Sequence, residues 1–415
     1  MWNSKSKCKA RTGSRACVMC VAVAILAGAC GGPQNVAEER ARRAEANRGD
    51  ILIGAAWPWS SREDGMYGEG MQMAVDEINA AGGVLGRPVR VLKEDDHESV
   101  NEGRLVAQRF ANNLDVVAVI GHLNSHVSIP AASIYENAGL LMLTPASTSP
   151  ELTRLGFRRV FRSVNNDETV SREMVAYAVE KGYGRVVICY VRNEYGLGLA
   201  NAFEQGATEV GIEIVDRQSY DPASSNRPRS FERMLDEWKD QDFDAIFLAG
   251  MPPQAGYFVA QARASGIRAP IFGGDALDSM EMVESAGAAS EGVVVASVFH
   301  PDNPRPEVQR FDRAFFDRYG KRPDSWAARG YEAVRLLAHA MEVAGSTVPD
   351  QVAAALRSLD GWPGITGAFS FDANGDVVGN AMVRAIVRNR QFAFLEDGAV
   401  ASASSRAPVK NVAAR

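Results

Sequence analysis

Residues 116–152 read VVAVIGHLNSHVSIPAASIYENAGLLMLTPASTSPEL. The apolar run Val116–Ile120 predicts a buried strand, and Leu140–Leu143 predicts a second one. The polar and small residues between the two runs are numerous enough to form a helix. Since parallel strands need a crossover connection of this length, the stretch predicts a βαβ unit with a parallel pair of strands.

The same alternation of short apolar runs and helix-length segments extends along most of the chain. Further strands are expected at residues 51–56, 88–92, 186–191, 212–215, 245–248, 270–272 and 293–296, and helices at 66–81, 101–112, 306–319 and 325–343. Near the C-terminus, Asn374-Gly375 within residues 369–378 predicts a hairpin. The series therefore predicts an α/β fold with parallel sheets that are covered on both faces.

The N-terminus has the pattern of an export signal. Residues 1–29 contain five Lys or Arg and no acid, and they end in the uncharged run 16–29, which is too short to span a membrane. The small residues before Cys30 resemble the lipobox of bacterial lipoproteins, which implies lipidation of Cys30. The alternative is ordinary cleavage after Ala27-Gly28-Ala29. In both cases we expect an extracytoplasmic protein, with residues 30–49 as a charged, Ala-rich tether.

Composition narrows the function classes. The chain has 415 residues, a formal net charge of −6 and 46% hydrophobic residues, so two or three soluble domains are expected and a nucleic-acid partner is not. Cys189 is the one cysteine after Cys30 and lies in an apolar run, which predicts a buried strand residue. The tail, residues 393–415, is rich in Ala, Ser and Arg and is expected to be disordered.

A search for catalytic motifs finds no Walker sequence, no HExxH and no GxSxG. His97, His122 and His126 could meet as metal ligands at strand ends, but without a matching Glu or Cys pattern we favour polar residues that line a cleft. The sequence therefore predicts neither an enzyme nor a cofactor.

Several segments together resemble the type I periplasmic binding proteins of branched-chain amino acid ABC importers. The similarity is carried by residues 121–125, 130–136 and 143–152, and it extends to residues 73–86, 194–196, 271–275 and 371–376. It covers nearly all of residues 50–390. The order and spacing of these segments are specific, although each one alone is weak.

The resemblance implies two Rossmann-like lobes joined by three hinge crossings, with a ligand held between them. It places lobe 1 at residues 50–165 with 298–367, and lobe 2 at 166–297 with 368–392. The implied function is capture of an amino acid, branched-chain or otherwise apolar, and its delivery to ABC permease subunits by a protein anchored to the membrane through its lipid. The alternative is a sensor or cell-envelope regulatory lipoprotein of the same fold that acts by protein interaction.

The ligand site is expected at the strand ends. Ser125 and Thr148 stand at predicted helix starts, where hydroxyls and free N–H groups suit a carboxylate, although simple capping would also explain them. The resemblance adds Ala146, Ser147 and Tyr67 as ligand contacts and Asp275 as the partner of an ammonium group. Trp57, Tyr195 and Met251 suggest an apolar pocket. The family's disulfide positions are Glu98 and Asn124 here, and Met251 replaces a tyrosine.

Overall fold

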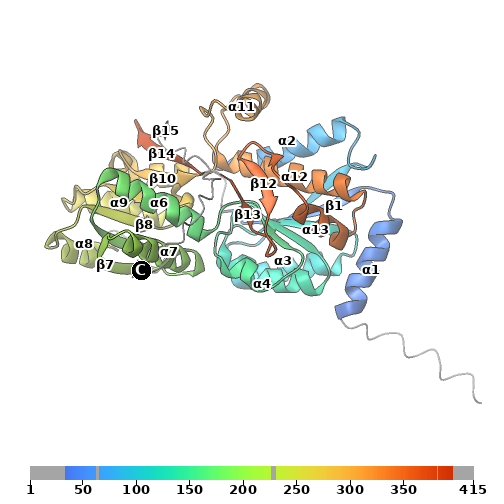
Figure 1. Cartoon of the computed structure of the whole chain (residues 1–415), viewed down its shortest axis with the longest axis horizontal. Helices are drawn as coiled ribbons and strands as arrows, with labels where there is room; N and C mark the ends of the chain where they lie inside the picture. Colours follow the sequence, from blue (N-terminus) through green and yellow to red (C-terminus); the bar gives the residue numbers. More distant parts are fainter. Residues whose placement is uncertain (1–32, 62–64, 226–229, 381, 396–415) are drawn as a thin grey trace, which may run out of the picture.

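The computed structural model describes residues 33–61, 65–225, 230–380 and 382–395. The predicted signal peptide, Cys30 and residues 396–415 lie outside the described residues. Two open sheets form two lobes that lie side by side (Figure 1). This arrangement confirms the predicted α/β fold. None of the described helices is long and apolar enough to cross a membrane.

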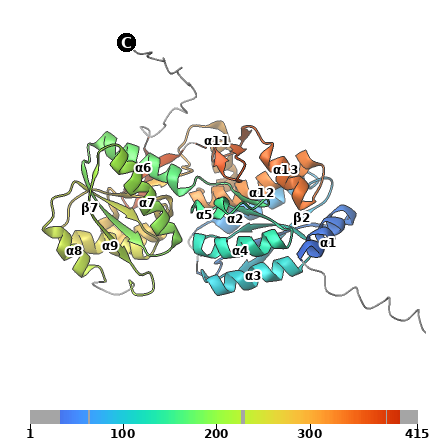
Figure 2. The ribbon, with the colours of Figure 1, turned by 60° about the horizontal axis from the view of Figure 1, so that its bottom comes forward.

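Lobe 1 is built on a five-stranded sheet with the order β2-β1-β3-β4-β5, and its strands are all parallel. The strands are β1 (Ile51–Trp57), β2 (Val89–Asp95), β3 (Val116–Gly121), β4 (Leu141–Thr144) and β5 (Val160–Arg162). The helices are α2 (Tyr67–Ala80), α3 (Val100–Asn112), α4 (Ser125–Asn137), α5 (Glu151–Arg154), α12 (Ser325–Ala344) and α13 (Pro349–Arg357). Figure 2 shows α3 and α4 on one side of the sheet and α2, α12 and α13 on the other. Burial on both faces explains the continuous apolar runs in the strands.

Lobe 2 is built on a seven-stranded sheet with the order β15-β14-β10-β9-β8-β6-β7. The parallel strands are β6 (Arg185–Val191), β7 (Glu213–Tyr220), β8 (Ala245–Ala249), β9 (Ile271–Gly273) and β10 (Val294–Ser297). The antiparallel edge, which the sequence did not predict, is β14 (Val383–Arg388) and β15 (Gln391–Leu395). The helices are α6 (Asp167–Lys181), α7 (Glu194–Glu209), α8 (Glu232–Lys239), α9 (Gln254–Ala264), α10 (Met280–Ala286) and the short 3-10 turns η1 (Asp275–Leu277) and η2 (Gly287–Ser290). Cys189 is fully buried in β6, as predicted.

The chain passes between the lobes after β5, after β10 and after the hairpin of β12 (Ala368–Phe371) and β13 (Val377–Val378). Helix α11 (Pro306–Tyr319) follows the second passage. The structure corrects the predicted third boundary, because β12 pairs with β11 (Trp362–Pro363) and the hairpin packs on lobe 1. Phe371 meets Phe161 of β5 edge to face at 5.4 Å between ring centroids. Residues 368–378 therefore belong to lobe 1, and the chain returns to lobe 2 at β14.

The turn of this hairpin requires its glycine. Gly375 has φ +90°, and a Cβ there would lie 2.3 Å from the carbonyl oxygen of Val160. Its own carbonyl accepts a hydrogen bond from the amide of Arg162 at 2.9 Å. The predicted Asn-Gly turn is confirmed, and its close approach joins it to the edge of the lobe 1 sheet.

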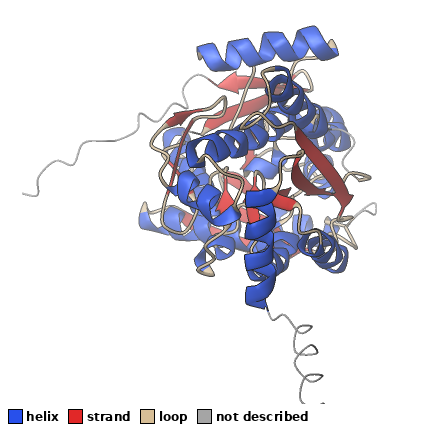
Figure 3. Cartoon of the chain, turned by 90° about the vertical axis from the view of Figure 1, so that its right-hand side faces the viewer, coloured by secondary structure: helices blue, strands red, loops and turns tan. Residues whose placement is uncertain are grey.

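The predicted tether is wrong for residues 33–46, which form helix α1 (Pro33–Ala46) packed on the outer end of lobe 1 (Figure 1). Seen from that end, helices surround the strands (Figure 3). The sequence was misleading because α1 has no apolar stripe, and its docking depends on a buried arginine. The predicted disordered tail is also wrong for residues 393–395, which form the end of strand β15.

Arg40 fixes α1 to the body of lobe 1. Its side chain is fully buried, and the guanidinium donates to four backbone carbonyls, those of Ala138 (3.1 Å), Asn113 (2.8 Å), Val116 (2.5 Å) and Ala111 (2.6 Å). Arginine carries five N–H donors in a planar fork, so one side chain can satisfy several carbonyls at once. Hydrogen bonds of Arg40 therefore hold the helix on lobe 1, together with a small apolar contact of Ala44 with the lobe 1 core.

Replacing Arg40 with Ala is expected to lower the free energy of unfolding by about 2–4 kcal/mol and to release α1, because buried carbonyls lose their donors. Urea unfolding and amide hydrogen exchange in α1 would measure both effects. Arg42→Ala is the matched control, since Arg42 is 72% exposed and pairs only with Glu39 one turn away. An equal decrease in the free energy of unfolding of the two variants would contradict the role of Arg40.

Candidate functional site

An apolar cavity lies between the two lobes, with about 430 Å³ of empty space that is partly open to solvent. Its lining from lobe 1 is Trp57, Gly65, Tyr67, Leu123 and Trp326, and its lining from lobe 2 is Met251, Pro252, Ala276 and Ser279. Most of these residues follow the carboxyl ends of strands β1, β3, β8 and β9, where open parallel sheets bind their ligands. The structure thus brings together three of the predicted residues, Trp57, Tyr67 and Met251.

The walls of this cavity from lobe 1 are aromatic. Trp57 stacks on Tyr67 with 3.9 Å between ring centroids, and Trp326 meets Trp57 edge to face at 5.8 Å. The Tyr67 hydroxyl is buried and has no hydrogen-bond partner among the residues that the structure describes. Trp326 was missed by the sequence reasoning, although it stands one residue inside the predicted helix 325–343. Together the rings make a rigid apolar wall with one free polar group.

Ser125 lies at a helix start, as predicted, whereas Thr148 lies in a loop three residues before α5 begins at Glu151, so its predicted place at a helix start is wrong. Ser125 is the first residue of α4, and its hydroxyl oxygen accepts a hydrogen bond from the amide of Ser149 at 3.3 Å. The Thr148 hydroxyl is buried without a hydrogen-bond partner. Ala146, two residues earlier in the same loop, is buried too. Ser125 therefore links the two loops, while the Thr148 hydroxyl lies beside the carboxyl of Asp167.

Ser147 lies in the same loop, but its side chain turns into lobe 1. Its hydroxyl is 2.5 Å from that of Ser128 and lies within hydrogen-bond distance of the carbonyl oxygens of His122 (3.2 Å) and Leu123 (3.1 Å). Its amide donates to the Thr144 hydroxyl at 3.0 Å. The polar groups of Ser147 are thus used inside the lobe, unlike those of Thr148.

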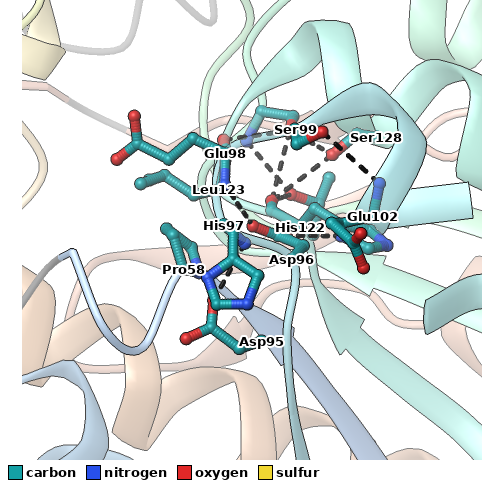
Figure 4. Close-up of polar contacts among 12 residues, drawn as sticks. Pro58, Asp95, Asp96, His97, Glu98, Ser99, Glu102, His122, Leu123 and Ser128 are labelled. Atoms are coloured by element: carbon teal, nitrogen blue, oxygen red, sulfur yellow. Dashed lines mark hydrogen bonds and ion pairs between the residues drawn. The ribbon is translucent and has the colours of Figure 1, made fainter. Parts of the chain in front are cut away.

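His122 is the centre of a buried network beneath this loop. Its Nδ1 lies 2.6 Å from Asp96 Oδ2, and its Nε2 lies 3.1 Å from the Tyr135 hydroxyl. Figure 4 shows the His122 ring with Asp96 and the His122 carbonyl with Ser128. His97 and His126 contact other partners, Ser60 and the Glu98 carbonyl. Within the described residues, no group of three His, Cys, Asp or Glu side chains is placed to hold a metal ion.

Arg162, at the end of β5, fixes the same loop from the hinge side. Its fully buried guanidinium donates to the carbonyls of Ser149 at 2.6 Å and Ser147 at 3.2 Å, and it forms an ion pair with Asp376 of the β12–β13 turn. Since Arg162 holds these carbonyls, the loop that carries Thr148 is tied directly to the segment where the chain crosses between the lobes.

Asp275 and Tyr195 form the polar side of lobe 2. Asp275 begins η1 after β9, and its Oδ1 is buried without a partner. Its Oδ2 accepts from Arg329 of lobe 1 at 3.2 and 3.3 Å. The Tyr195 hydroxyl accepts from the Ala276 amide at 3.3 Å. Burial raises the pKa of Asp275, and the charge of Arg329 opposes the rise.

Asp167 is a site residue that the sequence reasoning missed. It is the first residue of α6, fully buried, and neither carboxylate oxygen has a hydrogen-bond partner. Burial raises the pKa of Asp167 to about 8; the nearby Thr148 hydroxyl opposes the rise, and the charge of Asp275 adds to it. Asp167 directly follows the N-cap residue Asn166, just past the first hinge crossing. No periodic pattern of the sequence identifies such a position as part of a binding site.

The assembled groups suit a small zwitterion with an apolar side chain. The aromatic cavity excludes water from a hydrocarbon group, and the free oxygens of Asp167 and Asp275 suit an ammonium group. Ser125 at the start of α4 and the Thr148 hydroxyl suit a carboxylate, which the helix N-terminus also favours. The buried polar atoms without partners identify where such a ligand would form its hydrogen bonds.

Comparisons with known proteins show which proteins this chain resembles. A family model described as periplasmic binding protein matches residues 53–391. The Leu/Ile/Val-binding protein homolog 1 of Brucella abortus is 30% identical over 334 residues, which cover 79% of this chain and 87% of that protein.

Solved structures of ABC transporter proteins share the fold. A substrate-binding protein from Desulfitobacterium hafniense, solved in complex with Leu, is 42% identical and has a TM-score of 0.75, covering 83% of this chain and 100% of its own. The leucine-binding protein LivK of Thermotoga maritima is 29% identical with a TM-score of 0.77, covering 83% of this chain and 97% of its own.

Proposed function

Because the chain belongs to the periplasmic binding protein family, we propose that it is an extracytoplasmic solute-binding lipoprotein that captures an apolar amino acid between its lobes. The ligand is branched-chain or of similar shape, and it is delivered to an ABC permease. The observation that carries this proposal is the set of buried, unpartnered polar atoms on Thr148, Asp167 and Asp275 beside an aromatic cavity.

The ligand is oriented by charge. Its ammonium group lies between the free oxygens of Asp275 and Asp167, and its carboxylate lies at Ser125 and Thr148. The side chain extends into the cavity against Trp57, Tyr67 and Met251, with Ala146 and Tyr195 closing the space between the two ends. A desolvated ammonium requires such a carboxylate partner, because leaving it unpaired is costly. No covalent chemistry is needed for this function.

Thermal denaturation with a panel of amino acids, amides and small carboxylates tests the proposal. A ligand that binds only the folded protein adds about 2.7 kcal/mol of stability at a concentration one hundred times its Kd. Leucine, isoleucine and valine are expected to raise the melting temperature, and D-leucine is the matched control. Absence of a shift with every amino acid would favour a protein-interaction role instead.

Cys30 is proposed as the lipidated residue; it lies outside the described residues. Metabolic labelling with a fatty-acid analogue should mark the wild-type protein and not Cys30→Ser. Equal labelling of the two proteins would contradict the assignment. Since α1 begins only three residues later and is docked on lobe 1, a lipid at Cys30 would keep that lobe near the bilayer.

A further inference from the structure

One buried ion pair joins the two lobes across the cleft. Arg329 lies in α12 of lobe 1, and Asp275 lies in η1 of lobe 2. Their side chains are 1% and 5% exposed, with Nη2 of Arg329 3.2 Å and Nη1 3.3 Å from Oδ2 of Asp275. Both donors use the same oxygen. The pair therefore leaves Oδ1 of Asp275 free while it holds the lobes together.

Arg329 is held in place on its own lobe. Its guanidinium lies over the ring of Trp326 at 4.7 Å, and Trp326 is part of the cavity wall. Next to it, Gly330 packs against α2 so closely that a Cβ would lie 2.3 Å from the Tyr67 carbonyl oxygen. Helix α12 is thus fixed against the helix that carries Tyr67, so the position of Arg329 is set by lobe 1 alone.

We propose that Arg329 is a positioning residue that latches the lobes closed through one oxygen of Asp275 and presents the other oxygen to the ligand. The latch itself rests on geometry, and the role toward an ammonium group rests on the proposed function. Arg329 donates to Asp275 and lies over the ring of Trp326, so it acts through these two residues.

The charge distribution explains why a latch is needed. Three acids of lobe 2, Asp275, Asp278 and Asp167, are buried in this structure. Asp278 accepts a hydrogen bond from the Ser297 hydroxyl, and it faces Arg329, His300 and the Ser325 hydroxyl. The groups that face Asp167 are Arg162, Glu168 and the Thr148 hydroxyl. Asp275 faces Arg329, the Tyr195 hydroxyl and Asp167. Without Arg329, the closed empty cleft would bury Asp275 beside another acid and without a cation.

The latch predicts that the protein samples a closed state without ligand. An interlobe distance can be measured with paired labels at Arg104→Cys on α3 and Gln205→Cys on α7, both exposed, in a background in which Cys8, Cys17, Cys20 and Cys30 are replaced with Ser. Cys189 is buried and will not react. Arg329→Gln should remove the closed population of the ligand-free protein, and Arg329→Lys should restore part of it. Closed populations that are equal in wild type and Arg329→Gln would overturn the proposal.

Arg335→Gln is the matched control. Arg335 lies on the same helix, and its guanidinium is 3.5 Å from Glu77 of its own lobe. Its replacement should leave the closed population unchanged, because no interlobe contact is lost. A loss as large as that of Arg329→Gln would show that any change on α12 opens the cleft, which would also overturn the latch.

A pH profile separates the latch from a general structural effect. In Arg329→Gln, closure requires Asp275, whose pKa burial raises, to take up a proton, so the residual closed population should rise as the pH falls. Adding Asp275→Asn should abolish the part of the rise that is due to this residue. A profile identical in the single and double variants would contradict the pairing. The interlobe distances are measured without ligand, so they test the latch even if no amino acid binds.

Leucine affinity tests the second half of the proposal. If the binding-competent state falls to about a tenth of its population, the apparent Kd of Arg329→Gln should rise about tenfold. An unchanged Kd together with a lost closed population would overturn the coupling to ligand binding. Failure of leucine to bind the wild type would instead count against the proposed function.

Discussion

Asp275→Ala is expected to weaken amino acid binding by about thirtyfold to several-thousandfold. Truncating one side of a buried, hydrogen-bonded charge pair costs about 2–5 kcal/mol. Here the loss has two parts, because the ligand's ammonium loses its partner and Arg329 is left beside it as an unpaired cation. Calorimetric titration would measure the change, with circular dichroism showing that the variant is folded.

Ser125→Ala is the comparison for this variant. It removes one hydroxyl near a carboxylate that backbone N–H groups also hold, so its cost should be about 1–2 kcal/mol. The structure adds that this hydroxyl also accepts from the Ser149 amide, which sets part of the loop. The effect of Asp275→Ala should therefore be the larger. Near-wild-type affinity for Asp275→Ala would mean that the ligand has no ammonium group at this site.

Affinity for an amino acid is expected to rise with pH, by up to about tenfold per unit between about pH 6 and pH 8. The pKa of Asp167 is raised to about 8 by burial, so its carboxyl holds a proton in the empty cleft below that pH. A ligand's ammonium favours the ionised form, and binding then releases the proton. Release of this proton costs less free energy as the pH rises toward the pKa of Asp167, so the affinity for the amino acid increases with pH.

Asp167→Asn should flatten this profile, and calorimetry in buffers of different ionisation enthalpy should show fewer protons released. The free energy of unfolding of the ligand-free protein should change in the opposite direction. A carboxyl whose pKa is raised on folding lowers that free energy as the pH rises from about 4 to about 8. Asp167→Asn should remove that loss. Any slope left in this variant includes Asp275, Asp278 and Glu332, because burial raises the pKa of all three carboxyls, that of Glu332 to about 7. A profile that Asp167→Asn leaves unchanged would contradict the assignment.

The fold could be predicted well because parallel βαβ units have a strong pattern. Runs such as Val116–Ile120 are buried on both faces of a sheet, so they are apolar without interruption. The resemblance to type I periplasmic binding proteins implied Tyr67 as a ligand contact and marked Met251 as a replaced tyrosine, and Trp57 was added for its apolar ring. No local pattern of the sequence shows that these three residues meet.

The remaining features depend on contacts between distant parts of the chain. Helix α1 has a polar sequence, and only the carbonyls of lobe 1 explain why Arg40 is buried. The hairpin after β11 is held on lobe 1 by Phe371 and Phe161, a pairing that no local pattern marks. Asp167 and Arg329 are ordinary charged residues near helix starts in sequence, and their role appears only when the two lobes face each other.

Isothermal titration of the purified full chain with L-leucine and with 4-methylpentanoate, its analogue without the ammonium group, tests the central claim most directly. The account predicts one tight site for L-leucine and a loss of at least about a hundredfold for the analogue, since it has no ammonium group to pair with the second oxygen of Asp275 and with Asp167. Equal binding of the two compounds, or tighter binding of the analogue, would contradict it.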